Sequence, residues 1–156
     1  MWQRIFALYL AALAANAATE AHFLNRTVTV NGTEYRYVVS VPGDWTAAKT
    51  WPIVLFLHGS EERGDDGVAQ SKAGLANAVR NHAGHFPAIV VMPQCRLKVS
   101  WEAPAMEAQI MAALDASAKE FNGDPQRTYL TGFSMGGYGT WLIGARHPTR
   151  FAALVV

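Results

Sequence analysis

Uninterrupted apolar runs alternate with stretches of helical spacing along most of this chain. Three runs have the composition of buried strands, at residues 53–57, 88–92 and 152–156, and residues 128–133 are predicted as a further strand. Three stretches place apolar residues three or four positions apart, as amphipathic helices do, at residues 71–81, 104–121 and 136–146. This alternation predicts a mostly parallel sheet with helices on both faces, which is the α/β class.

The first part of the expected domain follows a different pattern. Residues 27–30 and 34–41 are rich in β-branched and aromatic side chains, and Asn31-Gly32 separates them. Asn-Gly favours the tight turn of a hairpin. The sequence therefore predicts an N-terminal antiparallel hairpin ahead of the parallel part, and it shows no internal repeat or domain linker.

Residues 1–17 have the layout of a secretory signal peptide. Arg4 precedes the apolar stretch 5–13, and small residues then lead to Ala15-Asn16-Ala17. The apolar stretch is short for a bilayer span. We therefore expect cleavage at or near Ala17, a secreted or periplasmic protein and no stable membrane insertion. The alternatives are a membrane anchor and a buried first helix.

Residues 18–156 are expected to form one α/β domain that is incomplete at its C-terminal end. The chain stops inside the apolar run 152–156, without a turn, a cap or a polar tail. A strand in that position lacks the downstream neighbours that would bury it. We therefore expect the sequence to be truncated.

Composition and charge narrow the classes of function. Hydrophobic residues make up 51% of the chain and charged residues 16%, which is typical of a globular core. The formal net charge is +1 and no run of Lys or Arg occurs, so nothing indicates a nucleic-acid partner. Cys95 is the single cysteine, so no internal disulfide forms. Its place after an apolar run predicts a buried small side chain rather than a nucleophile.

The candidate chemistry centres on Gly132-Phe133-Ser134-Met135-Gly136, which matches G-x-S-x-G between a predicted strand and a predicted helix. In such a turn the serine has a strained backbone, and Gly132 and Gly136 are needed because neighbouring chain passes close by. A chance match and a phosphate-binding turn are the alternatives. The Lys-Ser or Lys-Thr of a P-loop is absent after these glycines. We therefore interpret Ser134 as a nucleophile.

A second candidate segment, His58-Gly59-Ser60, directly follows the apolar run 53–57. Acyl transfer builds negative charge on a carbonyl oxygen, and hydrogen-bond donors must already face that oxygen. We expect these donors to be the backbone N–H groups of Ser60 and Met135. His58 precedes the serine in the chain, so we interpret His58 and Gly59 as support for the loop rather than as part of a triad.

Several stretches together resemble a known family: Leu57 to Ser60, Glu62 to Asp65, Val90 to Cys95, Asp124 to Arg127, and Gly132 to Trp141. They resemble the α/β-hydrolase superfamily, within the phospholipase/carboxylesterase and the secreted "predicted peptidase" or polyhydroxybutyrate-depolymerase-like esterases. The resemblance implies a triad in the chain order Ser, Asp, His. The Asp and the His are therefore expected beyond residue 156. Glu61 departs from the family pattern, which often has a glycine there. This departure either alters the oxyanion loop or places a carboxylate near the entrance of the substrate pocket.

The remaining candidates have plainer interpretations. His147 lies at the far end of the helix 136–146, roughly 15 Å from the serine at a rise of 1.5 Å per residue, and is expected to be a helix-end cation. Trp101 either lines a substrate pocket or packs a loop, and packing is favoured. Tyr138 and Trp141 are expected in the core. Residues 62–66 are interpreted as a salt-bridged loop beside the site rather than a metal-binding loop.

The sequence therefore predicts a serine hydrolase that cleaves small-molecule or polymeric carboxylic esters by two-step acyl transfer, without a cofactor or metal. A serine peptidase of the same fold is one alternative. A non-catalytic binding protein or an inactive fragment is another. Residues 1–156 by themselves are expected to be inactive, because the triad partners of Ser134 are expected elsewhere.

Overall fold

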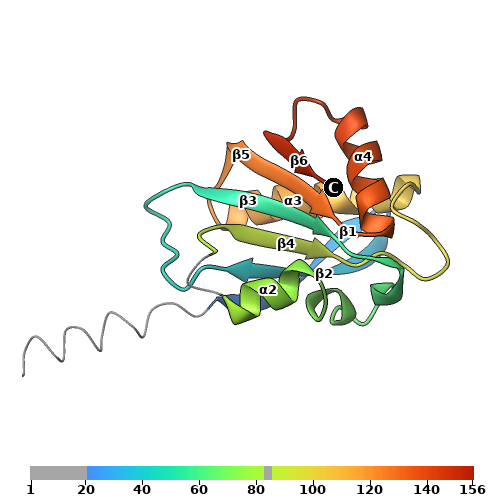
Figure 1. The fold of residues 1–156 in the computed structure, drawn as a ribbon, viewed down its shortest axis with the longest axis horizontal. Helices are drawn as coiled ribbons and strands as arrows, with labels where there is room; N and C mark the ends of the chain where they lie inside the picture. The colour runs from blue at the N-terminus through green and yellow to red at the C-terminus, as the bar shows by residue number, and fades with distance from the viewer. Residues whose placement is uncertain (1–20, 83–85) are drawn as a thin grey trace, which may run out of the picture.

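The computed structural model describes residues 21–82 and 86–156, so the expected signal peptide lies outside the described residues. Six strands form one sheet in the order β1-β2-β4-β3-β5-β6 (Figure 1). Their bounds are β1 His22–Val30, β2 Thr33–Val41, β3 Trp51–Leu57, β4 Ile89–Pro93, β5 Gly123–Gly132 and β6 Ala153–Val155. β2 is antiparallel to β1 and to β4, whereas β4, β3, β5 and β6 are parallel. The predicted fold class and hairpin are confirmed.

Helices cover both faces of this sheet (Figure 1). One face carries α2 (Leu75–Asn81), and the other carries α3 (Pro104–Glu120) and α4 (Met135–Arg146). Successive side chains of β3 point to opposite faces, so Leu55 belongs to the apolar core under α3 and α4 and Phe56 to the smaller core under α2. Two 3₁₀ helices, η1 (Ser60–Glu62) and η2 (Ala69–Ser71), lie in the loop between β3 and α2.

Among the boundaries that differ from the sequence prediction, such as the start of β1 at His22 rather than 27, two have a clear physical cause. The helix expected from residue 71 begins at Leu75, because Gly74 at φ +54° separates it from η2. β5 begins at Gly123 rather than at 128, although the segment from Asn122 reads as a turn. There Trp51 pairs with Gly123 and Ile53 pairs with Thr128 across a bulge, so tertiary pairing extends the strand.

The outer face of α4 and the strand β6 are exposed, and the first of these corrects an expectation. Tyr138 and Trp141 are 74% and 65% exposed rather than part of the core. The buried side of α4 carries small residues such as Gly139 and Thr140, so the aromatic side chains lie on the opposite side. Among the described residues β6 pairs with β5 and is exposed, with Val155 at 65%, as expected for a strand without downstream neighbours.

Candidate active site

The loops that follow β3, β4 and β5 meet at one edge of the sheet, because these parallel strands all end there (Figure 1). His58 follows β3, Gln94 follows β4 and Phe133 follows β5. The N–H of Phe133 donates to the carbonyl oxygen of Leu57 at 3.3 Å, so the first and last of these loops are in direct contact. The two candidate segments of the sequence are therefore brought together.

Ser134 stands at the N-cap of α4 with φ +53° and ψ −121°. This conformation is rare for a residue with a side chain and costs about 1–3 kcal/mol. The Gly136 N–H donates to the Phe133 carbonyl at 2.8 Å, and the Gly137 N–H donates to the Ser134 carbonyl at 2.9 Å. The chain thus turns directly from β5 into α4, and Ser134 lies exposed at the turn.

Close backbone packing explains both glycines of this turn. A Cβ atom on Gly132 would lie 2.3 Å from the carbonyl oxygen of Gly136. A Cβ atom on Gly136 would lie 1.9 Å from the carbonyl oxygen of Leu57. Neither clash involves a flexible side chain, so no rotamer change can relieve it. The turn keeps its shape only while these two positions lack side chains.

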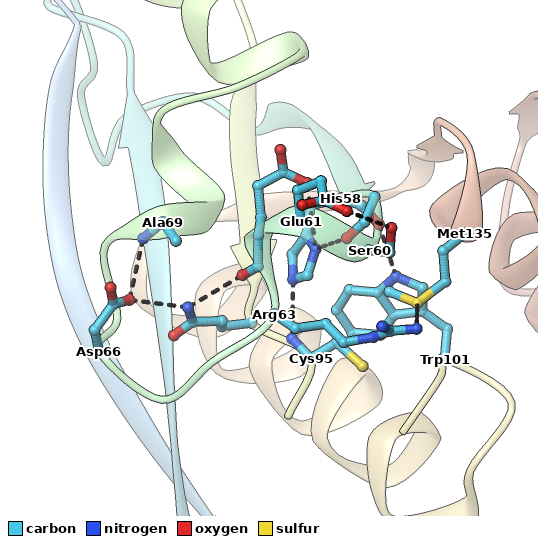
Figure 2. Close-up of polar contacts among 12 residues, drawn as sticks. His58, Ser60, Glu61, Arg63, Asp66, Ala69, Cys95, Trp101 and Met135 are labelled. Atoms are coloured by element: carbon cyan, nitrogen blue, oxygen red, sulfur yellow. Dashed lines mark hydrogen bonds and ion pairs between the residues drawn. The ribbon is translucent and has the colours of Figure 1, made fainter. Parts of the chain in front are cut away.

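The ring of His58 is fully buried and joins the loop after β3 to the loop after β4 (Figure 2). Its Nε2 accepts the N–H of Cys95 at 3.0 Å, and its Nδ1 lies 2.6 Å from the carbonyl oxygen of Gly59. Because the Cys95 amide can only donate, Nε2 carries no proton and Nδ1–H donates to Gly59. Burial, followed by the effect of the Arg63 charge, lowers the pKa of His58 to about 4 despite the hydrogen bond to Gly59. His58 is therefore neutral near pH 7, and its basic nitrogen is already occupied.

Trp101 packs beneath the same loop and is also fully buried. Its indole N–H donates to the carbonyl oxygen of His58 at 3.0 Å, and the two ring centroids lie 4.8 Å apart in an edge-to-face arrangement (Figure 2). In the described part of the chain Trp101 thus packs against the loop after β3.

Gln94 organises the next part of the loop from its buried position after β4. Its Oε1 accepts the N–H of Gly67 at 2.8 Å. Its Nε2 donates to the carbonyl oxygen of Glu62 at 3.2 Å and to Oδ1 of Asp66 at 2.9 Å. Sequence analysis did not identify this role. The signal was a polar residue directly after a fully buried strand, where a side chain must find partners.

Charged residues complete the same segment. Asp66 Oδ1 accepts the N–H groups of Val68 and Ala69 at 2.8 and 3.1 Å, and these bonds together with Gln94 lower the pKa of the Asp66 carboxyl. Asp65 forms a salt bridge with Arg96 at 3.2 Å. In the ranges 21–82 and 86–156, no three His, Cys, Asp or Glu side chains gather as metal ligands. The segment has the interactions of a salt-bridged loop.

The two N–H groups expected to bind an oxyanion begin η1 and α4, at Ser60 and Met135. Within the described part of the chain, neither N–H has a hydrogen-bond partner. Arg63 links the two segments, because its Nη2 donates to Sδ of Met135 at 2.9 Å (Figure 2). Glu61 is exposed beside them and accepts the hydroxyl of Ser60 at 3.3 Å. The contact of Arg63 with Met135 is a second feature that the sequence did not reveal.

Two other candidate groups are engaged elsewhere. His147, at the C-cap of α4, lies with Nε2 2.8 Å from Oε1 of Glu107, which also pairs with Arg146. Burial opposes ionisation of Glu107, but the hydrogen bonds from His147 and Arg146 outweigh it and lower the pKa of Glu107. Burial raises the pKa of the Cys95 thiol to about 11, so it stays protonated near pH 7. This agrees with a structural role for Cys95.

Two open hollows flank this edge of the sheet. One of about 400 Å³ borders Ser134, and its other walls are mostly apolar: Gly132, Phe133, Gly137, Tyr138, Trp141 and Val156. The other, of about 590 Å³, borders Arg63, and its other walls are Lys98, Val99, Ser100, Glu102 and Ala103. The hollow beside Ser134 is thus mostly apolar, whereas the hollow beside Arg63 is more polar.

Comparison with known proteins identifies the family of this chain. Residues 29–156 match the Esterase family model, described as "Putative esterase". The chain belongs to this esterase family. A search of curated proteins gave no match. Within the residues that the structure describes, no helix is both long and apolar enough to cross a membrane.

Solved structures extend the comparison. A thermostable esterase is 34% identical with a TM-score of 0.64, over 85% of this chain and 40% of that one. The fluorophosphonate-binding serine hydrolase F of Staphylococcus aureus is 19% identical with a TM-score of 0.70, over 86% of this chain and 56% of that one. A feruloyl esterase module from Clostridium thermocellum, complexed with sinapinate, is 17% identical with a TM-score of 0.69, over 87% and 53%. The last two likenesses show the α/β-hydrolase fold alone, and the chain spans 40–56% of the length of these structures.

Proposed function

We propose that this chain carries the nucleophile and the oxyanion donors of a secreted serine esterase. The observation that supports this most is the exposed Ser134 at φ +53°, held between two glycines at the start of α4. Strain of this kind costs stability and persists where it serves chemistry. A non-catalytic binding protein would gain nothing from a strained serine, so we favour the enzyme over that alternative.

The proposed reaction proceeds in two steps through an acyl-enzyme. The hydroxyl oxygen of Ser134 attacks the ester carbonyl carbon, and the carbonyl electrons move onto oxygen, where the N–H groups of Ser60 and Met135 hold the negative charge. The tetrahedral intermediate then breaks its bond to the leaving oxygen, which takes the proton removed from Ser134 and departs as the alcohol, and an ester remains on Ser134. A water molecule attacks this ester in the same way and releases the acid. No cofactor or metal takes part in this proposal.

The base that takes the serine proton is proposed to be a histidine outside residues 1–156, oriented by an aspartate that also lies outside them. Two histidines that the structure describes are already engaged, which supports this. His58 is buried with both ring nitrogens hydrogen-bonded, and His147 is paired with Glu107 at the far end of α4. The chain order Ser, Asp, His of this fold leads to the same expectation.

The decisive test removes the hydroxyl. In the intact protein, Ser134→Ala should lower kcat/KM for a simple carboxylic ester by at least about 10⁴-fold and abolish labelling by a fluorophosphonate probe. Ser71→Ala is the matched control, because the hydroxyl of Ser71 only caps a local turn by donating to the Val68 carbonyl. Full activity and labelling in the Ser134 variant would overturn the proposal.

The substrate is proposed to be a small-molecule or polymeric carboxylic ester, and secretion is proposed from residues 1–17. Sequencing the N-terminus of protein recovered from the periplasm or medium should give a start at or near Ala18. Recovery from the cytoplasm with an intact Met1 would contradict secretion and leave the esterase proposal untouched.

A further inference from the structure

Arg63 is a partly buried cation beside the proposed nucleophile, and it forms no salt bridge among the residues that the structure describes. Its Nη2 donates to the thioether sulfur of Met135 at 2.9 Å, and its Nε is buried without a partner. A thioether is a weak acceptor, and a guanidinium has five N–H donors. Burying such a group without an anion is costly. Arg63 therefore retains unused charge and donors.

The same side chain forms one wall of the open hollow of about 590 Å³ (Figure 2 shows its guanidinium reaching Met135). Lys98 contributes a second cation to that hollow and is held at φ +60° in an exposed turn. Ser100 adds a hydroxyl, which donates to the single lining carboxylate, Glu102, at 3.4 Å. Two cations and one carboxylate leave the hollow with net positive charge.

The contact with Met135 fixes where this hollow lies relative to the chemistry. Met135 directly follows Ser134, and its N–H is one of the two proposed oxyanion donors. A substrate with its ester at Ser134 would need a substituent that extends past Met135 to reach Arg63. The far side of the turn is mostly apolar, so a charged group would be bound on the Arg63 side.

We propose that the hollow lined by Arg63 and Lys98 binds a carboxylate carried by the substrate, so that the preferred esters are anionic. This rests on the proposed function and names the substrate class for the same site. The planar guanidinium of Arg63 matches a carboxylate with paired N–H donors, and Lys98 adds a point charge at the mouth of the hollow. Glu102 limits the site to one negative group by repelling a second.

The test uses two esters of similar length in the intact protein, neutral para-nitrophenyl butyrate and anionic mono-para-nitrophenyl succinate. The readout is the ratio of their kcat/KM values. Any effect of a substitution that acts through Met135 should change both values equally and so cancel in the ratio. Arg63→Gln should lower the anionic-to-neutral ratio by about 10-fold or more, as expected for losing a charge-assisted hydrogen bond. Arg63→Lys should lower it less, and Lys98→Gln by about 3-fold.

Lys119→Gln is the matched control, since it removes the same charge from the opposite end of α3, where Lys119 is exposed. The ratio should be unchanged in that variant, and added salt should lower the ratio in the wild type. The proposed carboxylate site would be contradicted if Arg63→Gln lowered kcat/KM equally for both esters and Lys98→Gln left the ratio unchanged. That result would leave the proposed esterase activity unaffected. If Arg63→Gln does not fold, the ratios measured for Arg63→Lys and Lys98→Gln test the proposal in the same way. A wild type that hydrolyses neither ester and takes no fluorophosphonate label contradicts the proposed function itself.

Discussion

The turn after β5 and the loop after β3 lie side by side at one edge of the sheet, yet different forces hold them in place. The turn at residues 132–136 has no side-chain cap and keeps its shape through backbone contacts that exclude any Cβ atom. The loop at residues 58–67 is held by buried polar side chains, chiefly His58 and Gln94. The turn is therefore fixed by close backbone packing. The loop is fixed by hydrogen bonds, and a single substitution or a change of pH can remove them.

The largest effect on stability is expected from adding a Cβ atom to the turn at residues 132–136. Gly136→Ala places a Cβ atom 1.9 Å from the Leu57 carbonyl oxygen, so it should destabilise the protein by about 3–5 kcal/mol or prevent folding. Gly137→Ala is the neighbouring control, because its nearest atom outside the local chain is Val156 Cγ1 at 3.4 Å. That change should cost less than about 1 kcal/mol and benefits from the helix propensity of alanine. Urea unfolding measures both, and equal costs would show that the turn is not sterically fixed.

The loop should instead respond to pH through His58. Its pKa falls from an ordinary 6.5 to about 4 in the folded protein, so the unfolded chain binds the proton more readily. The free energy of unfolding should be unaffected by this group above pH 6.5 and should fall by up to about 1.4 kcal/mol per pH unit between 6.5 and about 4.

His58→Gln separates this effect from that of the carboxylates. The variant loses stability near pH 7, because the Cys95 N–H loses its acceptor, but it should show a shallower decline between pH 6.5 and 4 than the wild type. Chemical unfolding at several pH values gives the two slopes. Parallel slopes would mean that His58 is not held neutral by its surroundings.

The smallest effect concerns the exposed part of the same loop. Asp66→Ala removes the acceptor for the N–H groups of Val68 and Ala69 and for Gln94, and should cost about 1 kcal/mol. Asp65→Ala removes only an exposed salt bridge with Arg96 and should cost about 0.5 kcal/mol or less. Asp66→Ala should therefore have a lower thermal unfolding midpoint than Asp65→Ala. A lower midpoint for Asp65→Ala would contradict the role given to the hydrogen bonds of Asp66.

The same contrast separates what the sequence could predict from what it could not. The turn at Ser134 follows from a local pattern, because strand, glycines and helix are consecutive in the chain. The contact of His58 with Cys95 joins two loops that only the β3–β4 pairing brings together, so no local pattern contains it. The contact of Arg63 with Met135 has the same origin.

The hydrophobic pattern of the sequence also could not predict which apolar side chains are exposed to solvent. Trp141 reads as a core residue because it is apolar, but burial depends on which element lies opposite it. Small residues take the sheet-facing side of α4, so Trp141 lies on the opposite side. The predicted start of β5 was also wrong, because the pairing of Gly123 with Trp51 in the sheet overrides the local turn propensity.

The strand order also has a consequence during synthesis. A chain leaves the ribosome from its N-terminus, and β1 and β2 can pair at once because one tight turn joins them. β3 is made next, but its neighbours β4 and β5 both follow it in the chain. Its apolar residues therefore emerge without partners and wait until Gly132 has been made before both edges are covered. During that interval the apolar residues of β3 lack the strands that pair with them in the folded sheet.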